Sequence, residues 1–136
     1  MKKRILIIEK NKRIAIPLVE QINWDPNLSA VHCGSIDDAI NESKKPFDMV
    51  IIDPIISGMN LLTENEIHEI DGNPLFKGFV LLRRLKTINP KVKIILYTTL
   101  SNEGVGLWKK TFDSHLCKPQ LFKIIKSEID KLLDFN

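Results

Sequence analysis

Residues 47–53 read FDMVIID, and they place an unbroken apolar run directly before an aspartate. Short runs that are rich in β-branched residues and show little alternation are typical of parallel strands buried on both faces. The residue that follows such a strand lies at the carboxyl edge of the sheet, where open α/β sheets bind their ligands. Asp53 is therefore a candidate functional residue.

Three further apolar runs end in the same way. Because the carboxyl ends of parallel strands meet at one edge, we expect the residues that follow these runs to lie close together. An acid, a nucleophilic carboxylate, a hydroxyl and an ammonium in one place favour a site that handles phosphoryl groups. The runs and the residues after them are 5–8 with Glu9 and Lys10, 94–97 with Thr98, and 116–117 with Lys118.

Length and composition fit one domain with one core, since the chain has 136 residues of which 43% are hydrophobic. The net charge of +3 is spread over several segments, which favours a solvated surface over a nucleic-acid interface. Two cysteines, Cys33 and Cys117, give no disulfide framework. The start has no signal-peptide core and no apolar run reaches membrane-spanning length, so we expect a soluble cytoplasmic protein.

Strands alternate with helices along the chain, which is the signature of a doubly wound parallel α/β sheet. Pro17 removes a backbone donor inside the first helix, so this helix should start late or be kinked. Gly104 and Gly106 each weaken the fourth helix by about 1 kcal/mol relative to alanine, so it should be short. The expected strands are 4–8, 28–33, 48–52, 92–97 and 115–117, and the expected helices are 12–22, 36–43, 79–88, 101–110 and 121–133.

Four segments have a distinctive order and spacing: ILIIEKN at 5–11, FDMVIID at 47–53, GFVLLRRLKTINPKVKIILYTT at 78–99 and LCKP at 116–119. Through them the chain resembles a response-regulator receiver domain of two-component signalling over nearly its whole length. The resemblance implies a flavodoxin-like (βα)5 fold with five parallel strands in the order 2-1-3-4-5. It also implies that a histidine kinase or phosphotransfer protein donates a phosphoryl group to Asp53.

The resemblance further implies roles for the other residues at this edge. Lys118 would pair with one phosphoryl oxygen, and the hydroxyl of Thr98 would donate to another. Mg²⁺ would be held by Glu9, Asp53 and the backbone carbonyl of Ile55. Since Mg²⁺ takes only one or two carboxylates, with waters and phosphate completing its six oxygens, each acidic ligand matters.

Lys10 departs from the family, whose first strand usually ends in two acids. A protonated lysine cannot bind Mg²⁺, but its ammonium could lie beside Asp53 as a built-in counterion and favour the ionised carboxylate. Alternatively, Lys10 points into solvent and Glu9 with waters still holds a weakly bound metal. We slightly favour impaired or metal-independent chemistry over ordinary use of Mg²⁺.

Two other positions bear on the site. Pro54 lacks an amide hydrogen, but the amide that contacts phosphate in the family matches Ile55, so Pro54 need not abolish the site. His115 stands where the family usually has a tyrosine or phenylalanine that swings inward on activation. It could be a weaker or pH-sensitive switch residue, although a surface histidine at a strand end is the simpler interpretation.

An inserted segment at about 60–77 makes the loop after the third strand about seventeen residues longer than is usual in the family, and such loops are commonly functional or disordered. It could cover the site or form a docking surface. Glu64 and His68 would share a face of a helix over 61–70, but a solvated acidic helix is more common than a metal site. Outside the insert, Trp108 is either an exposed docking residue or packs on the fourth strand, and Trp24 should cap the edge of the core.

The function we expect is that of a stand-alone receiver, not an enzyme, which signals through the face containing 101–110, His115 and the start of the last helix. Its partners would be a kinase or phosphotransfer protein and a downstream protein target or separate effector. We expect no direct nucleic-acid or membrane binding, and a homodimer stays open. The alternative is a pseudo-receiver that docks proteins constitutively, with Lys10 bonded to Asp53. A flavodoxin-like enzyme or flavin binder is disfavoured, because no glycine-rich turn follows the first strand.

Overall fold

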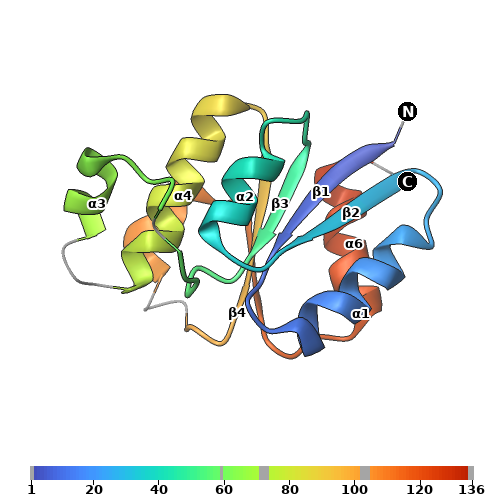
Figure 1. Ribbon diagram of the computed structural model, residues 1–136. Coiled ribbons are helices and arrows are strands. Elements are labelled where there is room, and N and C mark those ends of the chain that lie inside the picture. Colours follow the sequence, from blue (N-terminus) through green and yellow to red (C-terminus); the bar gives the residue numbers. More distant parts are fainter. Residues whose placement is uncertain (1, 59, 71–73, 102–104, 135–136) are drawn as a thin grey trace.

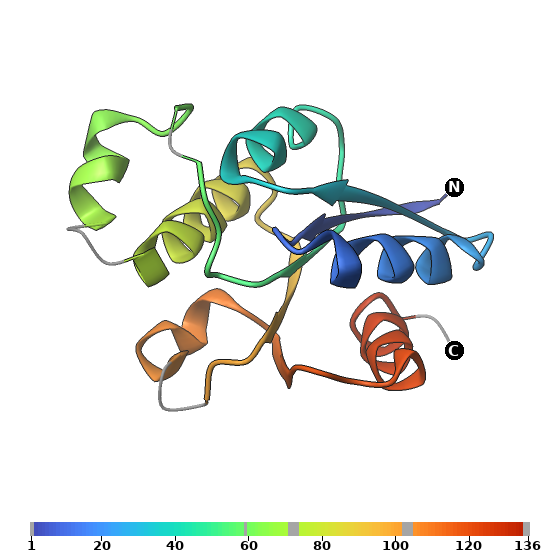
Figure 2. The same cartoon turned by 60° about the horizontal axis from the view of Figure 1, so that its bottom comes forward.

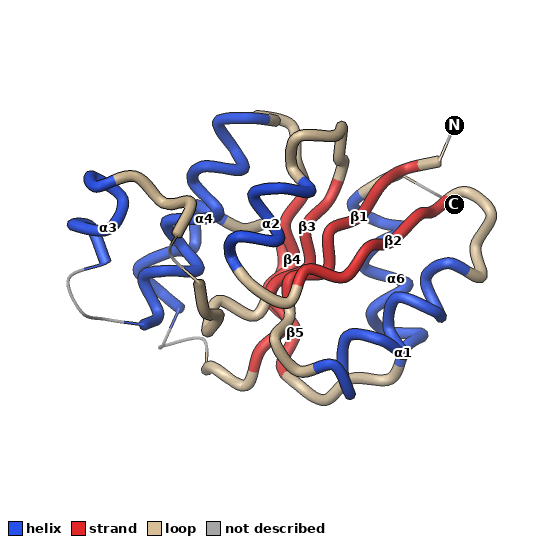
Figure 3. The backbone as a smooth tube through the Cα atoms, in the orientation of Figure 1, coloured by secondary structure: helices blue, strands red, loops and turns tan. Residues whose placement is uncertain are grey.

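The sheet has five parallel strands in the order β2-β1-β3-β4-β5 (Figures 1 and 3), so the expected fold and strand order are confirmed. The structure is a computed structural model that describes residues 2–58, 60–70, 74–101 and 105–134. The strands are β1 (Lys3–Ile8), β2 (Leu28–Cys33), β3 (Met49–Ile52), β4 (Lys93–Thr98) and β5 (Ser114–Cys117). Their bounds lie within about one residue of those expected from apolar runs, since burial on both faces selects such runs.

Helices cover both faces of the sheet (Figure 2). The described helical elements are α1 (Lys12–Asn23), α2 (Ile36–Glu42), α3 (Glu64–Ile70), α4 (Pro74–Ile88), the 3-10 helix η1 (Gly106–Thr111) and α6 (Phe122–Leu132). Successive residues of β1 point to opposite faces, as the pleat of a strand requires. Ile5 and Ile7 pack with α1 and α6, while Leu6 and Ile8 pack with α2 and α4. The core is therefore two apolar layers on either side of the sheet. Among the described residues, no helix is both long enough and apolar enough to cross a membrane.

Helix α1 begins at Lys12, so the late start expected from Pro17 is wrong. The side chain of Asn11 accepts a hydrogen bond from the amide of Arg13 and caps the helix before the proline is reached. Pro17 is exposed, and the carbonyl that lacks its partner can be solvated. At the other end, Trp24 is 76% exposed, which overturns its expected place at the core edge.

The inserted segment breaks the strict alternation of strands and helices. Along the chain, helix α3 comes between β3 and α4. In space it packs against the outer side of α4, at the far left of Figure 1. Helix α4 starts at Pro74 rather than at the expected residue 79, and proline is well suited to the first position of a helix. The insert is thus a helix and an extra turn that extend one face of the domain.

Between β4 and β5 the chain forms the 3-10 helix η1, where an α-helix over 101–110 was expected. Part of that expected helix, residues 102–104, lies outside the described residues. Trp108 stacks on Phe79 of α4, with ring centroids 4.5 Å apart and planes 2° from parallel. The tryptophan therefore packs against α4 and the core layer that includes Ile94 and Leu96 of β4, and it is half-buried rather than an exposed docking residue.

Candidate functional site

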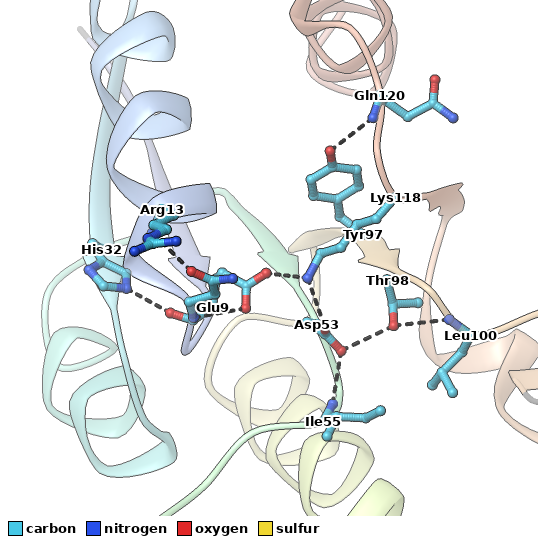
Figure 4. Close-up of polar contacts among 11 residues, drawn as sticks. Glu9, Arg13, His32, Asp53, Ile55, Tyr97, Thr98, Leu100, Lys118 and Gln120 are labelled. Atoms are coloured by element: carbon cyan, nitrogen blue, oxygen red, sulfur yellow. Dashed lines mark hydrogen bonds and ion pairs between the residues drawn. The ribbon is translucent and has the colours of Figure 1, made fainter.

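Four strand ends place the candidate residues at the carboxyl edge of the sheet. Glu9 follows β1, Asp53 follows β3, Thr98 ends β4 and Lys118 follows β5. Strands β1, β3, β4 and β5 are consecutive neighbours in the sheet, so residues far apart in sequence meet within one hydrogen-bonded cluster (Figure 4). The structure thus brings together the four side chains that the sequence pattern selected.

Lys118 bridges the two carboxylates of this cluster. Its ammonium Nζ donates to Asp53 Oδ2 over 2.7 Å and also donates to Glu9 Oε1. All three side chains are nearly buried. One cation therefore neutralises part of the charge of two acids that would otherwise repel each other.

The second oxygen of Asp53 has two neutral donors. The hydroxyl of Thr98 and the backbone amide of Ile55 each lie 3.1 Å from Oδ1. Thr98 is fully buried, and its hydroxyl oxygen accepts a bond from the amide of Leu100 over 3.3 Å. Asp53 thus lies among an ammonium, a hydroxyl and an amide, which are the donor types that phosphoryl oxygens require.

Glu9 is also held from its own side of the sheet. Its Oε2 accepts the amide of Asn11 over 3.2 Å, and its backbone carbonyl accepts Nε2 of His32 over 2.7 Å. His32 lies on β2, the strand beside β1. These bonds restrain the carboxylate and the backbone of Glu9 and so keep the carboxylate beside Lys118.

The electrostatic balance of the cluster keeps Lys118 protonated. Burial disfavours its charged form, but the bonds and charges of Asp53 and Glu9 outweigh this effect and raise the pKa of Lys118. The ammonium is therefore present over the whole physiological pH range.

Lys10 is exposed and is not among the described partners of Asp53. The salt bridge on which the pseudo-receiver hypothesis relied is therefore not seen among the described contacts. The counterion of Asp53 is Lys118, which comes from the opposite end of the chain.

A close backbone approach fixes the loop after Asp53. A Cβ atom added at Gly78 would lie 2.2 Å from the carbonyl oxygen of Pro54, so only glycine fits there. Helix α4 consequently presses directly on the loop that carries the amide of Ile55. Pro54 itself leaves that amide in place, as the sequence suggested.

The two acids of the site carry the kind of oxygen ligand that Mg²⁺ binds. Two carboxylates, those of Glu9 and Asp53, share one cationic partner, and Mg²⁺ is usually bound by one or two carboxylates with waters. Within the described part of the chain, no group of three His, Cys, Asp or Glu side chains is placed to hold a metal. Glu64 and His68 are exposed on α3, so the alternative metal site of the insert gains no support.

His115 lies on β5 and makes an edge-on contact with Phe112, with ring centroids 6.1 Å apart. It is half-buried rather than a fully exposed surface residue. It lies on the strand that leads to Lys118, and its role as a switch residue stays a prediction.

Sequence reasoning missed two residues of the site, Tyr97 and Gln120. The ammonium of Lys118 lies over the ring of Tyr97, 5.7 Å from its centroid, and the amide of Gln120 donates to the tyrosine hydroxyl over 3.0 Å. The available signal was an aromatic residue directly before Thr98. It was taken as part of the apolar run.

No known protein-family model matches the sequence, and neither does any curated protein sequence. Solved structures do match. A response regulator receiver domain protein (CheY-like) from Methanospirillum hungatei has a TM-score of 0.79 at 18% identity, covering 98% of this chain and 95% of that one. The response regulator TrrA from Thermotoga maritima, in complex with Mg²⁺ and BeF, has a TM-score of 0.72 at 21% identity, covering 96% and 98%.

A structure named adenylate cyclase, from Rhodopirellula baltica, also matches, with a TM-score of 0.75 at 17% identity and coverage of 99% and 90%. Several of the matching structures are named as receiver domains, and the chain shares their fold. At these identities the likeness establishes the fold alone. The function must be argued from the site.

Proposed function

We propose that this chain is a receiver that takes a phosphoryl group onto Asp53 from a phosphohistidine of a kinase or phosphotransfer protein. The observation that carries the proposal is the surroundings of Asp53. Its two oxygens lie within 3.1 Å of an ammonium, a hydroxyl and an amide, on three different elements. A carboxylate kept only for stability needs no such set of donors at the edge where α/β sheets bind ligands.

The transfer is a substitution at phosphorus. One oxygen of Asp53 forms the new P–O bond while the P–N bond to the histidine of the partner breaks, and the imidazole leaves with the electron pair. Before the reaction, the ammonium of Lys118 donates to Asp53 Oδ2. Afterwards its ammonium can follow the added charge to a phosphoryl oxygen.

Thr98 and Ile55 supply the remaining donors. Both now donate to Asp53 Oδ1, and both can donate to phosphoryl oxygens once that atom is esterified. A bound Mg²⁺ would be held by Glu9, Asp53 and the backbone carbonyl of Ile55, and would neutralise the negative charge that crowds the site.

The output we propose is a change in protein interaction. Thr98 precedes the segment that leads to η1, and His115 lies on the strand that ends beside Lys118. A phosphoryl group that attracts Thr98 and Lys118 therefore acts on both flanks of η1. Phosphorylation would then bias a two-state surface made of η1, His115 and the start of α6.

The test is phosphorylation by acetyl phosphate, with and without Mg²⁺, followed by intact mass spectrometry. We expect one phosphoryl adduct on the wild type and none on Asp53→Asn. Asp38→Asn is the control, because it removes an exposed carboxylate near the same edge of the sheet. No adduct on the wild type, under conditions that label an ordinary receiver, would refute the proposal.

A matched pair of variants tests the role of Lys10. Lys10→Asp restores an acid at the second position after β1 and should strengthen the dependence of labelling on Mg²⁺. Lys12→Asp makes the same change of charge at an exposed position two residues further on and should leave it unchanged. Equal responses would mean that only net charge matters.

The second candidate function is a pseudo-receiver that docks proteins without being phosphorylated. One observation favours it: the bonds of Lys118 already compensate both acids without a metal. In this case the wild type would stay unlabelled, and Asp53→Asn would bind the same partner as the wild type.

A further inference from the structure

We infer that Tyr97 is a positioning residue that holds Lys118 at the site through both its ring and its hydroxyl. Tyr97 and Thr98 are consecutive on β4, so their side chains point to opposite faces of the sheet. Thr98 reaches Asp53 directly. Tyr97 belongs to the core layer of α1 and α6 and reaches the site through Lys118.

The ring of Tyr97 supports the ammonium of Lys118. The distance of 5.7 Å from Nζ to the ring centroid lies within the range of a cation–π contact. The tyrosine is only 8% exposed, and the lysine side chain is nearly buried, so water screens this contact little. The ring thus adds a contact to the cation beside those made by the two carboxylates.

The hydroxyl of Tyr97 fixes the backbone on which Lys118 stands. It accepts the amide of Gln120, two residues after the lysine, over 3.0 Å (Figure 4). On the other flank, the amide of Lys118 itself donates to the carbonyl of Thr98 over 3.0 Å. The segment 118–120, which carries the lysine, is therefore bonded to β4 at both of its ends.

Lys118 is long and flexible, and fixing such a side chain costs rotamer entropy. Tyr97 places the ammonium between Glu9 and Asp53 before any phosphodonor arrives. The chemical consequence rests on the proposed function: a lysine that is already in place speeds transfer to Asp53. The structural consequence, an ordered Lys118, is independent of that function.

The first experiment is NMR of the Lys118 side chain and of backbone amide exchange in three variants. Tyr97→Phe keeps the ring, so the Lys118 signals should stay, while exchange of the Gln120 amide should quicken about tenfold, as expected for one lost hydrogen bond. Tyr97→Leu removes ring and hydroxyl, so the Lys118 signals should also move to those of a mobile lysine.

The control is Ile95→Val, on the same strand and in the same core layer. It should lower the stability but leave the signals of Lys118 and Gln120 unchanged, because Ile95 pairs with Ser114, four residues before the lysine. Wild-type signals in Tyr97→Leu, at a stability no higher than that of Ile95→Val, would overturn the inference. If Tyr97→Leu does not fold, unchanged exchange of the Gln120 amide in Tyr97→Phe overturns it instead.

Labelling by acetyl phosphate adds a second readout, with Tyr97→Leu expected to react about tenfold more slowly than Ile95→Val, the effect of one lost positioning contact. The two claims can fail separately. If the wild type is never labelled but the NMR results are as expected, the proposed function fails and the role of Tyr97 stands. If the wild type is labelled but the Lys118 signals do not change in Tyr97→Leu, the proposed function stands and the role of Tyr97 fails.

Discussion

Two sets of ion pairs in this molecule, one at the carboxyl edge of the sheet and one between α3 and α4, have different surroundings. At the carboxyl edge, the side chains of Lys118, Glu9 and Asp53 are 9%, 6% and 11% exposed. On the insert, Arg83 pairs with Glu69 and Arg84 with Glu66, and these four side chains are 18–52% exposed. The groups are chemically alike, but the solvent around them is not.

The difference teaches which charges the fold depends on. Water and salt screen the pairs between α3 and α4, so each contributes little to stability. At the site the charges have lost most of their water, and only their mutual bonds compensate for this loss. Charged residues in the insert can therefore vary freely, while those at the site depend on one another.

The largest effect should come from Lys118→Met, which leaves two buried carboxylates without their cation. We expect the free energy of unfolding to fall by about 3 kcal/mol, as for other buried pairs that lose one partner. Urea unfolding followed by tryptophan fluorescence measures this, and adding Mg²⁺ should restore part of the loss. A loss below about 0.5 kcal/mol would mean that the site behaves like a surface pair.

The next largest effect should be on the pH dependence of the free energy of unfolding, which distinguishes the buried pairs of the site from the exposed pairs of the insert. Because the pKa of Lys118 is raised in the folded state, its ammonium stabilises the fold fully below pH 10.5, the ordinary value for lysine. This stability is lost as the pH rises through the folded-state pKa. The wild type should therefore lose its advantage over Lys118→Met in alkaline solution. Burial also raises the pKa of Cys33 to about 12, so this thiol destabilises the fold at high pH. The effect is the same in both proteins, so the difference between their free energies of unfolding reports on Lys118.

The loop after Asp53 should respond strongly to Gly78→Ala. The new methyl group would collide with the carbonyl of Pro54, and overpacking of this kind costs about 1–3 kcal/mol. Gly106→Ala is the control, since a Cβ atom there meets nothing within 4 Å. Equal unfolding midpoints for the two variants would contradict the close approach of α4 to the loop.

The smallest effect should come from Glu69→Gln on the insert. Its partner Arg83 is about half exposed, so we expect a change below about 0.5 kcal/mol in the free energy of unfolding. Raising the salt concentration should reduce even this change. A loss comparable to that of Lys118→Met would show that the insert is part of the structural core.

The apolar runs were enough to predict the strands and the residues at their ends, whereas the strand order was expected only from the resemblance to receiver domains. The four polar residues of the site could be selected because each follows or ends an apolar run, and the carboxyl ends of parallel strands meet at one edge of the sheet. They are Glu9, Asp53, Thr98 and Lys118. The range expected for the first helix, 12–22, matches α1 closely, but the late start inferred from Pro17 was wrong, because Asn11 caps the helix before Lys12. The start of α4 was missed, since proline at a first helical position gives little apolar periodicity.

By itself, then, the sequence determined the α/β fold class and the four polar residues of the site, and its resemblance to receiver domains implied the strand order. Only the tertiary structure decided that Lys118, not Lys10, compensates Asp53, that Tyr97 supports the lysine, and that the insert packs on α4. The physical reason is distance. Strand patterns are local and appear in the sequence, whereas the partner of a charge is chosen by side chains that meet only after the sheet has formed.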